Sequence, residues 1–558
     1  MKNSSILVRE QPSQTSPFQP VLDSFGSPMI MGCFALVVVL LLLQAFSGRK
    51  TVLSDARFAS HREIKQGNKK GLTQIAKGEI ASSALQLEDI TISDVQPAIA
   101  VVGKSGMGKT RYVIDPSLRS AIDQGWTNLV FDIKGDLIRK HAPYALAKGY
   151  KVYIYAPGFP YSDGLNFLEF MKDKDDAKTA EEIAKVMEAN FGVPGERKDG
   201  FFSPQAVAAL RLVFMMAKST CYPDLVTAWK FLSLPNLAKR LRTAHKYEYF
   251  ESSDLGVWVK EASTALRSMA DSGKTVQGIL GTSMTNFQRI IDPSIVPCLT
   301  NHTIPLDLRG KQIVFFQLDE QATSATAPLV AAAINMLLIR NLNAEVKRDN
   351  PLGLFLDEFD SISLPNIKDY ITKMRSYGLI ALLAYQSDAQ VYHRYTRDYA
   401  VSILSSCTTK MYFNPGHLET AERVSKSLGQ KEAKYNLNSR SRGGRGATRN
   451  TSEQLKLIPL IAANKINQMA TAEVIIIDNP GFSNRPYKKK FRINKRNNVL
   501  WRKTLPDIWF EKIKPCREKK IQKLMSEEID KTIEDREIVA EANMPSEQEI
   551  EELQHIGN

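Results

Sequence analysis

Short, nearly continuous apolar runs recur along this chain, and segments with helical spacing separate them. Runs rich in β-branched and aromatic residues predict strands that are buried on both faces. Strands that alternate with helices in this way are typical of a mostly parallel sheet covered on both sides. We therefore predict an α/β fold with strands near residues 98–102, 129–132, 151–155, 312–317, 354–357, 379–384, 409–413 and 474–477.

The pattern changes between residues 170 and 304. Residues 176–190 and 203–217 have apolar positions at helical spacing, and the β-branched runs disappear. We interpret 170–304 as an all-α domain inserted into one nucleotide-binding domain, which consists of 91–169 and 305–484.

One apolar stretch near the N-terminus is unlike the rest. Met29–Phe46 is apolar except for Gln44. Its roughly 18 residues rise about 27 Å as a helix, enough to cross a bilayer core. We predict a single transmembrane helix at 28–47, preceded by a non-cytoplasmic tail at 1–27. Lys and Arg crowd the segment 48–90 that follows, so this basic membrane-proximal linker and the bulk of the chain are expected in the cytoplasm.

Charge gives further indications. The net charge of +14 favours an anionic partner, either nucleic acid or a membrane surface. The basic run 439–446 predicts a flexible loop. Residues 485–523 are basic and 525–558 are acidic, which is typical of a solvated, partly disordered tail; the acidic part would suit recognition of a basic protein. The five cysteines are scattered and suggest neither a metal site nor a disulfide framework.

The strongest chemical signal is a G-x-x-x-x-G-K-[ST] motif between a predicted strand and a predicted helix at 111–124. In this context the backbone N–H groups of the loop surround phosphate groups. Lys109 is expected to reach the β- and γ-phosphates, and the Thr110 hydroxyl to bind Mg²⁺. The predicted nucleotide-binding residues are Gly103, Lys104, Ser105, Gly106, Met107, Gly108, Lys109 and Thr110.

Two other strand ends could complete the site. Asp357 and Glu358 follow an apolar strand, as expected for a carboxylate that holds the Mg²⁺ shell and one that polarises an attacking water. Gln386 ends another strand, where an amide could sense the γ-phosphate or could simply belong to a turn. The chain is therefore expected to bind a nucleoside triphosphate with Mg²⁺.

In order along the chain, several motifs resemble those of the type IV coupling proteins of bacterial conjugation, the VirD4/TraG/TraD-like ATPases. They are the phosphate loop, Asp132-Ile133-Lys134-Gly135-Asp136, Leu356-Asp357-Glu358-Phe359, Arg375-Ser376-Tyr377-Gly378 with Gln386-Ser387, and Glu419-Thr420-Ala421-Glu422. Two stretches depart from the family pattern, with Phe167 in place of Pro and Ser406 in place of Asn. Many members carry two transmembrane helices, whereas this sequence predicts one.

The resemblance implies a RecA-like, hexameric ATPase in the bacterial inner membrane that moves single-stranded DNA. It also implies that Asp132 and Lys134 lie beside the nucleotide, that Gln386 senses the γ-phosphate, and that Arg375 reaches a neighbouring subunit's site. Its partners would be DNA, a relaxase with accessory proteins, and the subunits of a type IV secretion channel.

Two alternatives remain open. The chain could be a double-strand DNA pump for chromosome segregation or phage assembly, or a docking module in which ATP binding only drives assembly. The adjacent carboxylates Asp357 and Glu358 argue against the docking module, since binding alone needs no group that activates water. We predict a coupling protein that delivers DNA with its relaxase to a conjugative channel.

Overall fold

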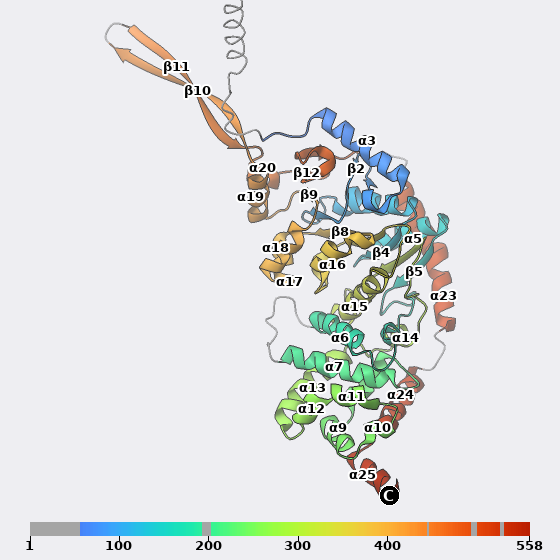
Figure 1. Cartoon of the computed structure of the whole chain (residues 1–558). Coiled ribbons are helices and arrows are strands. Elements are labelled where there is room, and N and C mark those ends of the chain that lie inside the picture. The colour runs from blue at the N-terminus through green and yellow to red at the C-terminus, as the bar shows by residue number, and fades with distance from the viewer. Residues whose placement is uncertain (1–55, 192–201, 444–445, 493–498, 525–528, 558) are drawn as a thin grey trace, which may run out of the picture. The chain divides into compact units, whose positions relative to one another are not determined.

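The structure, a computed structural model, describes residues 56–191, 202–443, 446–492, 499–524 and 529–557 (Figure 1). The predicted transmembrane segment 28–47 therefore lies outside the described residues. The chain divides into two units, and Gln430–Ile458 belongs to a unit separate from Ala56–Gly429 and Pro459–Asn558.

A nine-stranded sheet organises the larger unit, in the order β13-β12-β9-β3-β8-β7-β4-β6-β5. Its neighbours from β9 to β5 run parallel, whereas β12 pairs antiparallel with both β9 and β13. The mostly parallel sheet is thus confirmed. The strands are β3 (Ala98–Val102), β4 (Thr127–Phe131), β5 (Lys151–Tyr155), β6 (Gln312–Phe316), β7 (Leu352–Leu356), β8 (Leu379–Tyr385), β9 (Thr409–Tyr412), β12 (Glu473–Ile477) and β13 (Tyr487–Lys490).

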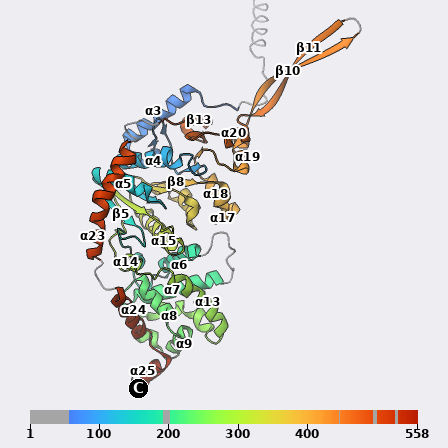
Figure 2. The same cartoon turned by 180° about the vertical axis from the view of Figure 1, so that it is seen from behind.

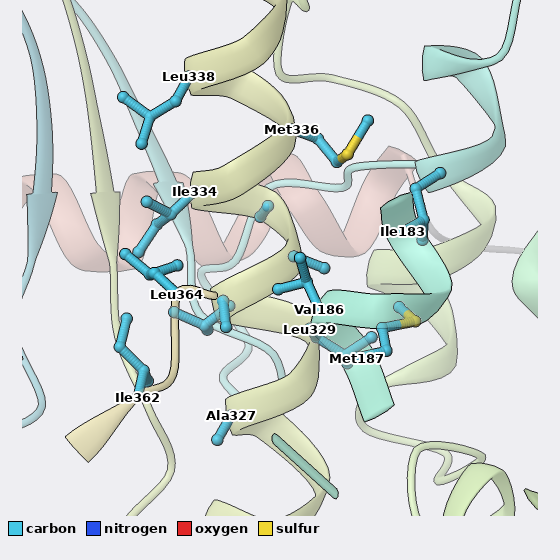
Figure 3. Packing of buried hydrophobic residues seen from close by; sticks show 14 of the residues in the cluster. Ile183, Val186, Met187, Ala327, Leu329, Ile334, Met336, Leu338, Ile362 and Leu364 are labelled. Atoms are coloured by element: carbon cyan, nitrogen blue, oxygen red, sulfur yellow. The ribbon is translucent and has the colours of Figure 1, made fainter. Parts of the chain in front are cut away.

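Each face of the sheet buries its own apolar core. On one face, α4 (Asp115–Asp123) and α5 (Asp136–Ala147) cover the strands. On the other face, α15 (Thr323–Asn341) packs against the sheet and against α6 (Ala177–Phe191), with Ile334, Val186 and Met187 in that core (Figure 3). Because every β3 side chain is buried, the strand carries no polar alternation.

One helix in the described part of the chain is long and apolar enough to cross a membrane. It is α15, and 78% of its apolar stretch is buried within the protein. Sheet and helices already cover this stretch on nearly all sides. We therefore regard α15 as the core helix of the α/β fold.

Among the described residues between β5 and β6 beyond residue 166, the regular elements are all helical, as the sequence pattern predicted (Figures 1 and 2). The predicted helices 176–190 and 203–217 are present as α6 and α7. Besides the short 3-10 turn Phe167–Phe170, the elements are α6 (Ala177–Phe191), α7 (Phe202–Lys218), α8 (Leu225–Ser233), α9 (Leu237–Lys246), α10 (Tyr249–Ser252), α11 (Gly256–Ala262), α12 (Thr264–Ser268), α13 (Gly273–Gln288) and α14 (Val296–Thr300).

The segment predicted as a membrane-proximal linker contains a well-formed helix, α3 (His61–Lys77). Ser60 and Glu63 cap its first turn reciprocally, which satisfies N–H groups that a helix start leaves unpaired. Its glycines face inward: a Cβ at Gly67 would lie 2.4 Å from the Gly481 carbonyl oxygen. Close packing that needs glycine leaves little signal in a pattern of apolar residues, so the sequence did not predict this helix.

The expectation of a solvated tail from 485 onward is wrong for most of that segment. Residues 487–490 form the edge strand β13. A helical run then leads through α22 (Leu505–Ile508) into α23 (Lys514–Leu524), followed by α24 (Ile529–Asn543) and α25 (Glu547–Gly557). Figures 1 and 2 show α24 beside the inserted helices, in agreement with its contacts to α8.

A buried ion pair explains why α24 packs there. Arg536 donates two hydrogen bonds of 3.1 Å to Asp224 Oδ2, and its guanidinium lies 4.2 Å from the centre of the Tyr222 ring. The acidic residues of α24 include the exposed Asp530, Glu534 and Glu541. A strongly acidic sequence can therefore still form a packed helix, because a few inward-facing residues are enough to hold it against the fold.

The second unit contains a two-stranded antiparallel ribbon in place of the predicted flexible loop. Its strands are β10 (Gln430–Gly443) and β11 (Gly446–Pro459), which form their own sheet. The run 439–446 therefore lies mostly within paired strands, apart from 444–445, which are outside the described residues.

Candidate functional site

The predicted phosphate loop connects β3 to a helix, as the motif requires. After the loop, a five-residue π-helical turn (Thr110–Ile114) leads into α4. The backbone N–H of Gly103 donates to the Tyr385 carbonyl at 3.3 Å, and that of Lys104 donates to the Asn414 carbonyl at 2.9 Å. Gly108 has φ +101°, a conformation that side chains disfavour. The loop is therefore held by both neighbouring strands, at the carboxyl edge of the sheet.

Lys109 lies inside this loop. Its side chain is only 8% exposed, and Nζ donates to the Gly103 carbonyl at 2.5 Å. Burial lowers the pKa of Lys109, while the nearby carboxylates of Asp357, Glu358 and Asp360 oppose that shift. A buried ammonium held by a single backbone carbonyl is well suited to an anionic ligand, which would offset its lost hydration.

The structure joins the two predicted Mg²⁺ ligands directly. Thr110 Oγ1 donates to Asp357 Oδ2 at 2.9 Å, although 247 positions separate the two residues in the sequence. Burial, above all, raises the pKa of Asp357 to about 6, and the hydrogen bond from Thr110 works against that shift. A hydroxyl and a carboxylate oxygen this close offer the hard oxygen ligands that Mg²⁺ prefers.

Glu358 and Gln386 lie in the same cavity as the phosphate loop. Since β8 lies between β3 and β7, Gln386 follows the strand next to the loop and Glu358 follows the next strand along. Glu358 has φ +60°, in the left-handed region that a glutamate seldom adopts. Such strain is often found at functional positions. Here it holds a half-buried carboxyl at the cavity instead of continuing β7.

Asp132 and Lys134 also line this cavity, but the Asp132 carboxylate already has backbone partners. It accepts hydrogen bonds from the Leu137 N–H at 2.6 Å and the Lys134 N–H at 3.2 Å, and so fixes the start of α5. Burial, followed by the charge of Asp357, raises the pKa of Asp132 to about 7. Its observed contacts position α5, whereas the Lys134 side chain borders the cavity.

The structure does not bring Arg375 to this site. Arg375 is exposed in a short turn (Met374–Tyr377) before β8, whereas Gln386 follows the end of that strand. The seven residues of β8 span about 23 Å. Arg375 lines a separate depression with Lys373 and Arg348. Within one chain Arg375 therefore lies at the amino-terminal ends of the strands, whereas the phosphate loop lies at their carboxyl-terminal ends.

The cavity at the phosphate loop has a volume of about 870 Å³. Part of its lining comes from residues that the sequence did not single out. Four of them belong to the supposed tail: Trp501, Arg502, Pro506 and Phe510. The available signal was the presence of aromatic residues within a basic stretch, which disorder does not explain.

Fold and site together define an α/β protein with a phosphate loop at the carboxyl edge of its parallel strands. The model of the family described as type IV secretory system conjugative DNA transfer matches residues 49–490. The chain belongs to this family of type IV coupling proteins, as the sequence motifs predicted.

Two of the similar proteins show how far the likeness extends. A probable conjugal transfer protein TraG from Sinorhizobium fredii (strain NBRC 101917 / NGR234) is 25% identical over 394 residues, which cover 67% of this chain and 59% of that protein. The type IV secretion system-coupling protein VirD4 of Bartonella henselae is 23% identical over 300 residues, which cover 52% of this chain and 47% of that protein. The chain thus spans less than two thirds of the length of either relative.

Solved structures of the bacterial conjugative coupling protein TrwB share the fold. A form in complex with sulphate has a TM-score of 0.54 at 16% identity and covers 80% of this chain and 95% of that one. The complex with the ATP analogue ADPNP has the same TM-score at 16% identity, with 76% and 93% covered. The complex with ADP and Mg²⁺ has a TM-score of 0.51 at 18% identity, with 76% and 92% covered.

Proposed function

We propose that this chain is a membrane-anchored coupling protein that uses ATP and Mg²⁺ to drive DNA into a conjugative type IV secretion channel. The contact between Thr110 and Asp357 beside a buried Lys109 carries the proposal, because this arrangement fits a metal-bound triphosphate. The expectation of ATP and Mg²⁺ agrees with the complexes of TrwB, whose fold this chain shares.

The residues have distinct tasks in the proposed reaction. Lys109 and the loop N–H groups hold the phosphate chain, and Thr110 with Asp357 holds Mg²⁺, which would neutralise developing charge. Glu358 accepts a proton from the attacking water, and Gln386 orients that water or the γ-phosphate. Both lie at the cavity, as these tasks require.

Arg375 is proposed to act on the site of a neighbouring subunit in a hexamer. It is exposed and lies across the sheet from its own phosphate loop, so it cannot stabilise the transition state there. A cation supplied in trans would make hydrolysis depend on assembly. The proposed hexamer passes single-stranded DNA and grips its phosphates through basic segments, largely without sequence preference.

The acidic face of α24 is proposed to recognise a basic cargo protein such as the relaxase. Asp530, Glu534 and Glu541 are exposed, whereas Thr532, Arg536 and Ala540 on the same helix are buried. Charge reversal of the three acidic residues to Lys should abolish relaxase pull-down and leave DNA-stimulated ATPase activity unchanged. Equal pull-down by both proteins would exclude this face as the docking site.

ATPase assays of the full chain in lipid nanodiscs test the central proposal. Single-stranded DNA should stimulate turnover more strongly with increasing length, and duplex DNA should stimulate it less. Stronger stimulation by duplex would favour the double-strand pump. Mg²⁺-dependent ATP binding without turnover under any of these conditions would favour the ATP-gated docking module.

A further inference from the structure

The cavity at the phosphate loop extends beyond what the phosphates and metal would use. One end is formed by the loop, Asp357, Glu358 and Gln386. The further lining residues include Arg119 from α4, Arg139 from α5, and the aromatic residues Trp501 and Phe510 from the C-terminal segment. The same cavity is thus polar and charged around the loop, and partly aromatic where the C-terminal segment closes it.

The aromatic residues of the C-terminal segment, here called the aromatic wall, pack against the rest of the fold. Trp501 packs against His141 and Tyr144 with ring centres 4.8 and 4.9 Å apart, and the Arg119 guanidinium lies 5.6 Å from its ring centre. Trp509 is buried and meets the Tyr161 ring edge-on at 5.7 Å. These contacts hold the segment against α4, α5 and the loop after β5. The aromatic wall is therefore a packed part of the cavity lining.

Phe510 differs from the buried Trp509 beside it, because about half of its side chain stays accessible. It is 49% exposed although it lines the cavity next to the buried Trp509. The Arg139 guanidinium lies 5.5 Å from its ring centre, and Asp136 holds that guanidinium through a 3.0 Å hydrogen bond. An exposed aromatic ring beside an oriented planar cation is a surface on which another flat ring can stack.

We propose that Phe510 and Arg139 form the nucleobase subsite of this cavity, whose lining also includes Trp501. The inference rests on the proposed ATP site and specifies how its nucleoside end is bound. A nucleotide carries a polyanionic phosphate chain and a base with a flat aromatic face, and the two parts of the cavity match these two parts. Any base can stack on an aromatic ring. Phe510 therefore adds to the affinity for nucleotides but discriminates little between adenine and guanine.

Equilibrium binding to the full chain in nanodiscs tests this subsite. Wild type, Phe510→Ala and Phe510→Trp are each titrated with ATP and with inorganic tripolyphosphate, both with Mg²⁺. Phe510→Ala should raise the Kd for ATP about tenfold and leave the Kd for tripolyphosphate unchanged, because only ATP carries a base. Phe510→Trp should keep the wild-type affinity. Trp258→Ala, which removes an exposed aromatic side chain from the inserted helices, should change neither value.

The outcomes separate the subsite from the site as a whole. Unchanged ATP affinity in Phe510→Ala overturns the subsite and leaves the proposed ATP site intact. Equal losses for ATP and tripolyphosphate also overturn it, because the effect would then be on phosphate binding. Absence of ATP binding by the wild type overturns the proposed function itself, and the subsite with it.

Discussion

The phosphate-loop region and the C-terminal segment beyond residue 485 meet at one cavity. Their structure and function could be predicted from the sequence to very different extents. In the first region, eight consecutive residues and two strand ends are enough to indicate the chemistry. In the second, charge suggested a solvated tail, whereas the chain forms an edge strand and packed helices.

The difference shows which kinds of contact a linear pattern records. The phosphate loop works through backbone N–H groups and side chains close in sequence, so its function needs a fixed spacing. The C-terminal segment works through a few inward-facing residues, such as Trp509 and Arg536, whose partners lie hundreds of residues away. The amino-acid composition of the segment hardly reflects these few residues, because most of its residues lie on the solvent-exposed face.

The largest effect is expected at the phosphate loop. Lys109→Ala should reduce ATP turnover at least 100-fold, because it removes the cation that meets the phosphate charge. The fold should survive, since the hydrogen bond of this side chain goes to a carbonyl of its own loop. A steady-state ATPase assay with circular dichroism as the folding control measures both. Substantial turnover in a folded Lys109→Ala protein would contradict the proposed site.

Glu358→Gln should separate binding from hydrolysis. The amide keeps the size of the side chain and loses the ability to accept a proton, so turnover should fall about 100-fold or more while the Kd for ATP stays near wild type. Binding and single-turnover assays on the same preparation give the two values. Normal turnover would remove Glu358 from the mechanism.

Arg375→Ala tests whether this side chain serves a neighbouring subunit. Alone it should lose most of the ATPase activity without weakening ATP binding, because Arg375 is remote from its own site. Mixed with Lys109→Ala chains, it should regain part of that activity at interfaces that combine an intact loop with an intact Arg375. A mixture no more active than either parent would exclude action in trans.

Arg536→Leu addresses the C-terminal side of the comparison. It leaves the buried Asp224 without its partner, which typically costs about 3–5 kcal/mol in free energy of unfolding. Arg242→Leu is the matched control, because its pair with Asp271 is exposed and should matter by less than about 1 kcal/mol. Denaturant unfolding compares the two variants. Equal, small effects would mean that α24 behaves as a solvated tail.

The smallest effect concerns pH. The pKa values of Asp357 and Asp132 are raised to about 6 and 7, so in the absence of ligand the folded protein binds more protons than the unfolded chain between about pH 4 and 7. These two groups should therefore make the apo protein more stable as pH falls through that window. Mg²⁺-dependent ATP binding should weaken over the same range, because Mg²⁺ needs the ionised Asp357.

Thermal unfolding at pH 5.5 and pH 8 measures the first effect, and Asp132→Asn is its control. The variant lacks one of the two titrating groups and should show a smaller difference between the two pH values. An unchanged difference would mean that Asp132 is ionised throughout.

How much the sequence predicted depended on the kind of interaction. All eight predicted strands are present, because strands buried on both faces are apolar at most positions. Helix α3 and the ribbon of β10 and β11 were missed, since both are polar and are visible only through capping, close glycine packing or strand pairing. The sequence indicated residues for the metal and the phosphates, but gave no sign that Phe510 lines the same cavity.

By itself, the sequence determined the α/β class, the phosphate loop and the family, because local spacing and strand apolarity are properties of contiguous residues. Tertiary structure decided which strand ends meet, so that Thr110 contacts Asp357 and Gln386 joins them while Arg375 is left at the far edge of the sheet. It also decided that the basic and acidic C-terminal segment is folded. The physical reason is that strand order and long-range side-chain pairs depend on the whole packed core, which no single segment encodes.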